Sequence, residues 1–168
     1  MLIAFTLLHV IISLIGIGTG FTFAWDLLSS RQRRGLTNVF LATTIATSVT
    51  GFVFPVHQIM PSHVVGAISL VVLVLALWAR TSFNTKGTLR RTYVLSTIAA
   101  LYLNVFVLVV QMFQKIAPLK ALAPTQSEPP FAIAQGVVLL GFAGIAWLAA
   151  KRFYPAVGRA HARAAALA

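Results

Sequence analysis

The amino-acid sequence predicts an all-α integral membrane protein that folds as a bundle of five transmembrane helices. The first observation is composition: 59% of the 168 residues are hydrophobic and only 9% are charged. A soluble globule of this size needs more polar surface than that. The second observation is the length of the apolar runs, each of which reaches the minimum of about 17 residues for a membrane-crossing helix. These runs cover residues 2–28, 36–56, 64–80, 92–113 and 131–150.

The first two runs differ in polarity. The run 2–28 is largely apolar, ends at Trp25 and Asp26, and is followed by three arginines. Pro55 marks the end of the run 36–56, because proline disrupts a helix interior. It contains five closely spaced hydroxyl side chains, which are Thr43, Thr44, Thr47, Ser48 and Thr50. Such hydroxyls bond to their own backbone or to a neighbouring helix, so we interpret them as contacts that hold helices together.

The later runs are separated by loops of different character. The connector 57–63 contains no Lys or Arg, whereas the loop after the run 64–80 is strongly basic. The loop 114–130 holds four prolines, which argue against one continuous helix there. Residues 156–168 form a basic, Ala-rich tail, and we assign residues 1–155 to a single transmembrane domain without internal repeats.

The Lys and Arg residues orient the predicted bundle. Eleven of them lie at the ends of the first, third and fifth runs or in the segments that follow these runs, and only Lys115 and Lys120 lie on the opposite side. Because positively charged loops are retained in the cytoplasm, we predict a periplasmic N-terminus and a cytoplasmic C-terminus. The tryptophans agree, since Trp25, Trp78 and Trp147 stand at the predicted inner ends of three helices, where indole rings favour the interface.

The composition also limits the chemistry of the protein. The sequence contains no cysteine, which excludes disulfides, thiolate metal sites and cysteine nucleophiles. The formal net charge of +11 fits the basic loops of a membrane protein better than nucleic-acid binding. No nucleotide-binding, serine-hydrolase or zinc-protease motif occurs, which favours a protein without enzymatic activity. His57, His63 and Glu128 have no spacing specific for a metal site, and we predict none.

Polar side chains gather at one predicted depth, in the outer leaflet. His9 stands 16 residues from Trp25, and His63 stands 15 residues from Trp78. At about 1.5 Å per residue, both histidines lie roughly 23 Å from the tryptophans. Further polar residues share this level or lead up to it from the second and fourth runs. The resulting candidate cofactor-binding layer consists of His9, His57, His63, Asn104 and Gln111.

Small residues on the first helix show which way the layer faces. One stripe recurs every three or four positions and therefore lies on one side of the helix. It consists of His9, Ser13, Gly16, Gly20 and Ala24. The Gly-xxx-Gly pattern within it favours close helix packing, so we expect this side to face protein.

Several functions are compatible with such a layer. A b-type haem is ligated by a pair of imidazoles on facing helices, so one hypothesis is that His9 and His63 approach each other and bind haem b. A quinone pocket would use the same His and Gln donors. The interpretation we favour is that His9 hydrogen-bonds to Gln111, Asn104 or a backbone carbonyl, while His57 and His63 are solvated at the interface.

The function classes can be ranked on the same evidence. Proton and ion transporters usually carry a charged residue at mid-membrane, and the two acids of this chain, Asp26 and Glu128, fall at the predicted edges instead. A small transporter is therefore the weaker hypothesis. We favour a non-catalytic accessory or assembly subunit, because small bundles with glycine-rich helix faces act through partner helices. The expected partners are the lipid bilayer and other membrane-protein helices, and not nucleic acid.

Three segments of the chain carry a family resemblance. They are Phe52–His63 (Phe-Val-Phe-Pro-Val-His-Gln-Ile-Met-Pro-Ser-His), Leu103–Gln111 and Pro124–Phe131. With these segments the chain resembles small multi-pass inner-membrane proteins of Gram-negative bacteria, a group with no established activity. The resemblance implies a helical multi-pass fold in the bacterial inner (cytoplasmic) membrane, and it implies no substrate or cofactor.

Overall fold

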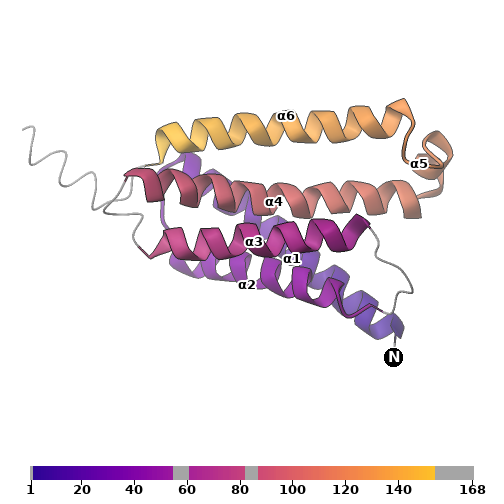
Figure 1. The fold of residues 1–168 in the computed structure, drawn as a ribbon, viewed down its shortest axis with the longest axis horizontal. Coiled ribbons are helices and arrows are strands. Elements are labelled where there is room, and N and C mark those ends of the chain that lie inside the picture. Colours follow the sequence, from indigo (N-terminus) through magenta and orange to yellow (C-terminus); the bar gives the residue numbers. More distant parts are fainter. Residues whose placement is uncertain (1, 55–60, 82–86, 154–168) are drawn as a thin grey trace, which may run out of the picture.

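The computed structural model of the chain describes residues 2–54, 61–81 and 87–153, and all its regular elements are helices. Five long helices run along the long axis of the molecule, and a short sixth helix caps one end (Figure 1). The elements are α1 (Leu2–Leu28), α2 (Arg34–Gly51), α3 (Pro61–Arg80), α4 (Gly87–Lys115), α5 (Ala117–Leu122) and α6 (Pro129–Arg152). We call the end that holds α5 and the start of α1 the α5 end, and the opposite end the basic end.

The helices α1, α3, α4 and α6 are long and apolar enough to cross a membrane, within the part of the chain that the structure describes. This confirms the prediction of an all-helical protein that contains helices able to cross a membrane by their length and composition. The helix α2 has 18 residues but a lower hydropathy, because threonine, serine, asparagine and arginine take up many of its positions. Hydropathy therefore does not support the prediction that α2 is a fifth membrane-crossing helix, and that prediction rests on other arguments.

The observed helix bounds differ from the predicted runs mainly at prolines and charges. The helix α3 begins at Pro61 and α6 at Pro129, because a proline fits the first turn, where no backbone donor is required. The helix α4 begins five residues before the predicted run 92–113 and includes Arg90 and Arg91. Charged residues end a membrane-compatible run, but they do not end a helix, since Arg is a good helix former. The loop expected at 114–130 contains the short helix α5, with Pro118 in its first turn.

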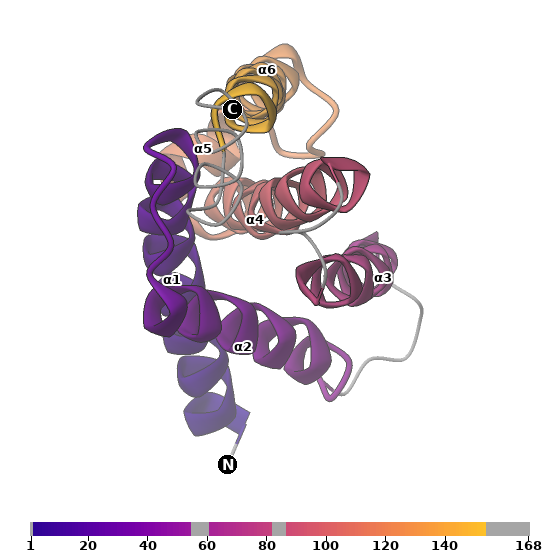
Figure 2. The same cartoon turned by 90° about the vertical axis from the view of Figure 1, so that its left-hand side faces the viewer.

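The helix α4 forms the centre of the bundle. It contacts every other described helix, and Figure 2 shows it in the middle with α1, α2, α3 and α6 around it. Its fully buried residues include Val94, Thr97, Ala100 and Leu101. Around it, α1 and α3 each pack against both α2 and α4, and α6 packs against α4 and α1.

The predicted small-residue stripe of α1 faces protein, as expected. A Cβ atom added to Gly16 would lie 3.2 Å from Oγ1 of Thr43 on α2. A Cβ atom added to Gly20 would lie 2.3 Å from Cδ1 of Leu101 and 2.9 Å from Cε2 of Phe40. The two glycines therefore let α1 approach both α2 and α4 closely. Gly18, two positions away, has nothing within 4 Å of such an atom and belongs to the opposite, exposed side.

Candidate functional site

His9 is the predicted site residue with the best-defined surroundings. Its Nδ1 lies 2.7 Å from Oγ1 of Thr50 on α2, and its ring packs edge-on against Phe54 with centroids 5.2 Å apart. The Thr50 hydroxyl donates its own proton to the Ala46 carbonyl at 2.6 Å. When this hydroxyl donates to Ala46, its oxygen is free to accept from His9 in the tautomer that is protonated on Nδ1.

This bond belongs to a series of contacts along the seam between α1 and α2. One turn further along α1, the Ser13 hydroxyl lies 3.4 Å from that of Thr47. One turn beyond that, Gly16 lies against Thr43. The hydroxyls of α2 thus join the two helices at successive turns.

The other faces of α2 make equivalent contacts with α3 and α4. The Ser48 and Ser69 hydroxyls lie 3.1 Å apart between α2 and α3. The Asn104 amide of α4 donates to the Thr44 hydroxyl at 3.4 Å. Thr44 and Ser48 also donate to carbonyls four residues earlier in α2, at 2.7 and 3.0 Å. The polar side chains of α2 are therefore bonded on three sides, as the interpretation of the hydroxyls as interhelix contacts requires.

The predicted cofactor layer is only partly assembled. His9 and Asn104 both contact α2, but through different residues and towards different helices. The imidazole of His63 packs against the ring of Phe52, with centroids 5.6 Å apart. Gln111 is exposed on α4 near the α5 end. His57 lies outside the described residues.

The structure gives His9 and His63, which were expected to approach each other, different neighbours. His9 lies on α1 and contacts Thr50 and Phe54, whereas His63 lies on α3 and contacts Phe52. The helix α2 contacts α1 on one side and α3 on the other (Figure 2). The two histidines do lie near the same end of the bundle, but equal depth does not fix lateral position. The geometry therefore gives no support to a bis-histidine haem between α1 and α3.

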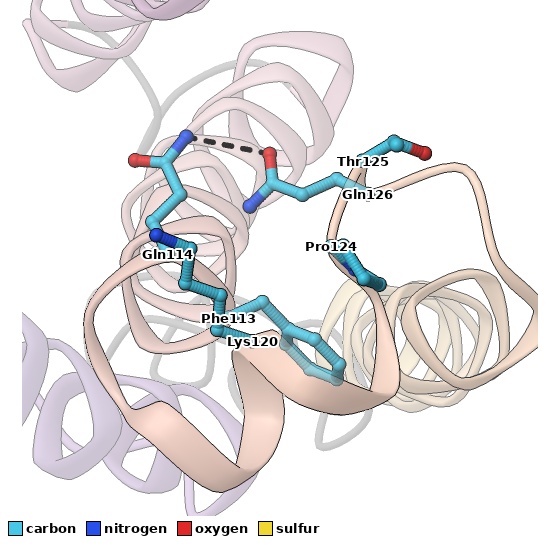
Figure 3. Close-up of a pocket in the computed structure, with 6 residues that line it drawn as sticks. All are labelled: Phe113, Gln114, Lys120, Pro124, Thr125 and Gln126. Atoms are coloured by element: carbon cyan, nitrogen blue, oxygen red, sulfur yellow. Dashed lines mark hydrogen bonds between the residues drawn. The ribbon is translucent and has the colours of Figure 1, made fainter.

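A second polar group, not foreseen from the sequence, lies at the α5 end. The Gln126 amide donates to the Val110 carbonyl at 2.9 Å, and Gln114 donates to Gln126 Oε1 at 3.3 Å (Figure 3). Gln126 adopts a left-handed backbone conformation, with φ of 60°. A pocket of about 270 Å³ opens beside this pair. It is lined by Phe113, Gln114, Lys120, Pro124, Thr125 and Gln126.

Glu128 closes this loop before α6. Its Oε1 accepts from the backbone N–H of Thr125 at 3.1 Å and from the Thr125 hydroxyl at 2.9 Å. The Thr-x-x-Glu spacing resembles that of a capping box, but Glu128 is itself the N-cap of α6, so these bonds close the turn before the helix. Desolvation raises the pKa of Glu128, but the hydrogen bonds from residues 125–128 outweigh it, and the net effect is a lowered pKa.

A third polar group lies at the basic end. Asp26 is only 2% exposed, and its two carboxylate oxygens accept from the Arg33 guanidinium at 2.7 and 2.8 Å. This hydrogen bond and the charge of Asp26 raise the pKa of Arg33. Arg80 donates to the Asn38 side chain at 2.7 Å. The Ser30 hydroxyl donates to the Arg152 carbonyl at 2.5 Å, which attaches the turn after α1 to the end of α6.

None of these groups has the composition of a metal centre. In residues 2–54, 61–81 and 87–153, no three His, Cys, Asp or Glu side chains come together in a way that could hold a metal ion. No family model, curated protein or solved structure matches the chain.

Proposed function

We propose that the chain is a five-helix protein of the bacterial inner membrane that acts as a non-catalytic accessory or assembly subunit. In this proposal the N-terminus is periplasmic, the C-terminus is cytoplasmic, and partner helices bind to the exposed face of α6. The proposal has three parts, which are the number of crossings, the orientation and the partner-binding face. Each part has its own support.

The course of the chain supports a fifth crossing by α2. The helix α1 ends at the basic end and α3 begins at the α5 end (Figure 1). The 18 residues of α2 connect these two ends, and at about 1.5 Å per residue they span roughly 27 Å, close to the thickness of the hydrocarbon core. Its polar side chains are bonded to α1, α3 and α4, which lowers the cost of placing them in the membrane.

The distribution of charge supports the orientation. Of the ten Lys and Arg residues in the described part of the chain, eight lie at the basic end, and the other two are Lys115 and Lys120. Positive charge favours the cytoplasmic side. The resemblance to inner-membrane proteins of Gram-negative bacteria supports the bacterial inner membrane as the location of the chain.

The observation that carries the proposed role is the outer face of α6. This helix packs against α4 and α1, and its buried Phe142 contacts the rings of Tyr102 and Phe21. Gln135 also donates a hydrogen bond to the Phe106 carbonyl of α4. The opposite face of α6 is open. Leu140 there is 74% exposed. A Cβ atom added to Gly141 or Gly144 would meet nothing within 4 Å. Glycines on an open helix face in a membrane let a second helix approach closely, which is how transmembrane partners associate.

The test adds large side chains to this open face at positions where they do not disturb the fold. In the double variant Gly141→Leu and Gly144→Leu, the new side chains have free space within the chain, so the protein should fold normally. We expect native electrophoresis of mildly solubilised membranes to show the wild-type chain in a complex and the double variant as the free chain. Gly18→Leu is the matched control, because Gly18 is equally open but lies on α1.

Two results would refute the role. One is a wild-type chain that migrates alone, and the other is a double variant that stays in the complex. Co-expression of tagged and untagged copies separates self-association from binding to another protein. If every bound partner is a second copy of this chain, the accessory role is wrong.

A further inference from the structure

The basic end carries a concentrated positive charge. The helices α1, α3 and α6 end there, and α2 and α4 begin there (Figure 1). Eight of the ten described Lys and Arg residues lie at this end. Asp26 is the acid among them, and Glu128, the other acid of the chain, precedes α6 at the far end. The end therefore has a large positive charge with little internal compensation.

Two of these cations serve the fold. Arg33 binds both carboxylate oxygens of buried Asp26, and Arg80 donates to Asn38. Arg90 is half-buried. The other five side chains are exposed, and we call them the basic rim. They are Arg31, Arg34, Arg91, Lys151 and Arg152. Within the described residues, none of these five takes part in an ion pair.

Contacts between helix ends hold the segments that carry the basic rim. Ser30 has a left-handed backbone conformation, with φ of 51°, and its hydroxyl donates to the Arg152 carbonyl. This contact places Arg31 next to the end of α6. Beneath the rim, Tyr93 and Phe153 are buried with ring centroids 6.3 Å apart. The cations of the rim thus extend from helix ends and from a turn that contact one another.

The tryptophans set the depth of the rim. Trp25, Trp78 and Trp147 are 64%, 59% and 58% exposed, and all three lie at the basic end. Nζ of Lys151 lies 3.7 Å from the centroid of the Trp147 ring. Exposed indole rings prefer the level of lipid headgroups. The rim follows the tryptophans toward the end of the bundle, so its cations stand at headgroup level.

We propose that the basic rim binds the headgroups of anionic phospholipids. A row of exposed cations at headgroup level attracts lipids with net negative charge and has no such attraction for zwitterionic ones. The lipid headgroups then supply negative charge that balances the cations of the rim. This inference goes beyond the proposed function, because it needs no partner protein and survives if α6 has none.

The test uses the fluorescence of the three tryptophans. The full chain is reconstituted into vesicles of brominated phosphatidylglycerol or brominated phosphatidylcholine, and bromine quenches the indoles that the lipid reaches. The ratio of quenching in mixtures gives the relative binding constant of the two lipids. For the wild type we expect a several-fold preference for phosphatidylglycerol that falls as salt screens the charges.

Two variants locate the preference. In Arg31→Gln/Arg34→Gln/Arg91→Gln/Arg152→Gln the relative binding constant should fall to about one, since only Lys151 of the rim keeps its charge. Lys151 is retained because it lies over Trp147 and its removal would change the fluorescence directly. The control Lys115→Gln/Lys120→Gln removes two cations at the α5 end and should leave the preference unchanged.

Each possible result of these measurements either supports or overturns the proposal. A wild type without a lipid preference, or a preference lost equally in the lysine control, overturns the proposal. If the rim variant does not fold, the salt dependence of the wild type still decides. Inorganic phosphate that abolishes the preference, where chloride of equal ionic strength does not, would show a soluble phosphate site instead of a lipid site.

Discussion

At the level of single residues, the bond between His9 and Thr50 is a short polar contact between α1 and α2, at 2.7 Å. We predict that Thr50→Val, which keeps the shape and removes the acceptor, lowers the free energy of unfolding by about 1 kcal/mol, as for other hydrogen bonds between membrane helices. Unfolding of the detergent-solubilised protein in sodium dodecyl sulfate measures this. Thr22→Val is the control, because the Thr22 hydroxyl bonds only to carbonyls of its own helix and is exposed. Equal losses in both variants would contradict the assignment.

Glu128 gives the α5 end a dependence on pH. Its pKa in the folded chain is lowered from the ordinary value of 4.5, so the carboxylate form stabilises the loop. This contribution is complete above pH 4.5 and disappears as the pH falls through the lowered pKa. We predict that acidification lowers the protection factors of the Thr125 and Ser127 amides, which correct for the intrinsic slowing of amide exchange at low pH, and that Glu128→Gln lowers these protection factors even at neutral pH. Unchanged protection factors in the variant would show that these hydrogen bonds do not hold the loop.

At the level of elements, α2 shows which helix contacts could be predicted from the sequence and which could not. The hydroxyl series predicted contacts between helices, and the bonds of Thr44, Thr47, Ser48 and Thr50 confirm it. Which helix each hydroxyl meets could not be predicted, because residues on one helix define directions and not neighbours. For the same reason, the equal depth of His9 and His63 does not show that they are neighbours. Depth follows from residue counting, whereas the order of helices around α4 is a property of the packed bundle.

The glycines of α1 test the closeness of its packing. We predict that Gly20→Ala lowers the free energy of unfolding by about 1–3 kcal/mol, because its Cβ would overlap with Leu101 and Phe40. Gly18→Ala, two residues away on the open side, should be neutral or slightly stabilising, since alanine favours the helix. Both variants are compared by thermal unfolding in the same detergent. If Gly20→Ala is tolerated as well as Gly18→Ala, α1 does not pack closely against α4.

At the level of the whole molecule, the apolar runs predicted the helices well because membrane-compatible length is a strong and local signal. The ends of those helices were less predictable, since the prolines at Pro61 and Pro129 begin helices instead of separating them. The contacts that assemble the basic end were not predictable at all. The bond from Ser30 to the Arg152 carbonyl joins residues 122 positions apart. Only the excess of Lys and Arg at that end was visible in the sequence.

The proposed topology rests on this excess together with an odd number of crossings. If α2 crosses the membrane as the other four long helices are able to, the two termini lie on opposite sides. We predict that a reporter active only in the cytoplasm is active when fused after Ala168 and inactive when fused before Met1, and that a periplasmic reporter behaves in the opposite way. Replacing Arg31, Arg33 and Arg34 by glutamine removes three cations from one loop and should weaken this orientation. The same substitution at Lys115 and Lys120 should strengthen it. Activity of one reporter at both termini would mean an even number of crossings, with α2 lying outside the membrane.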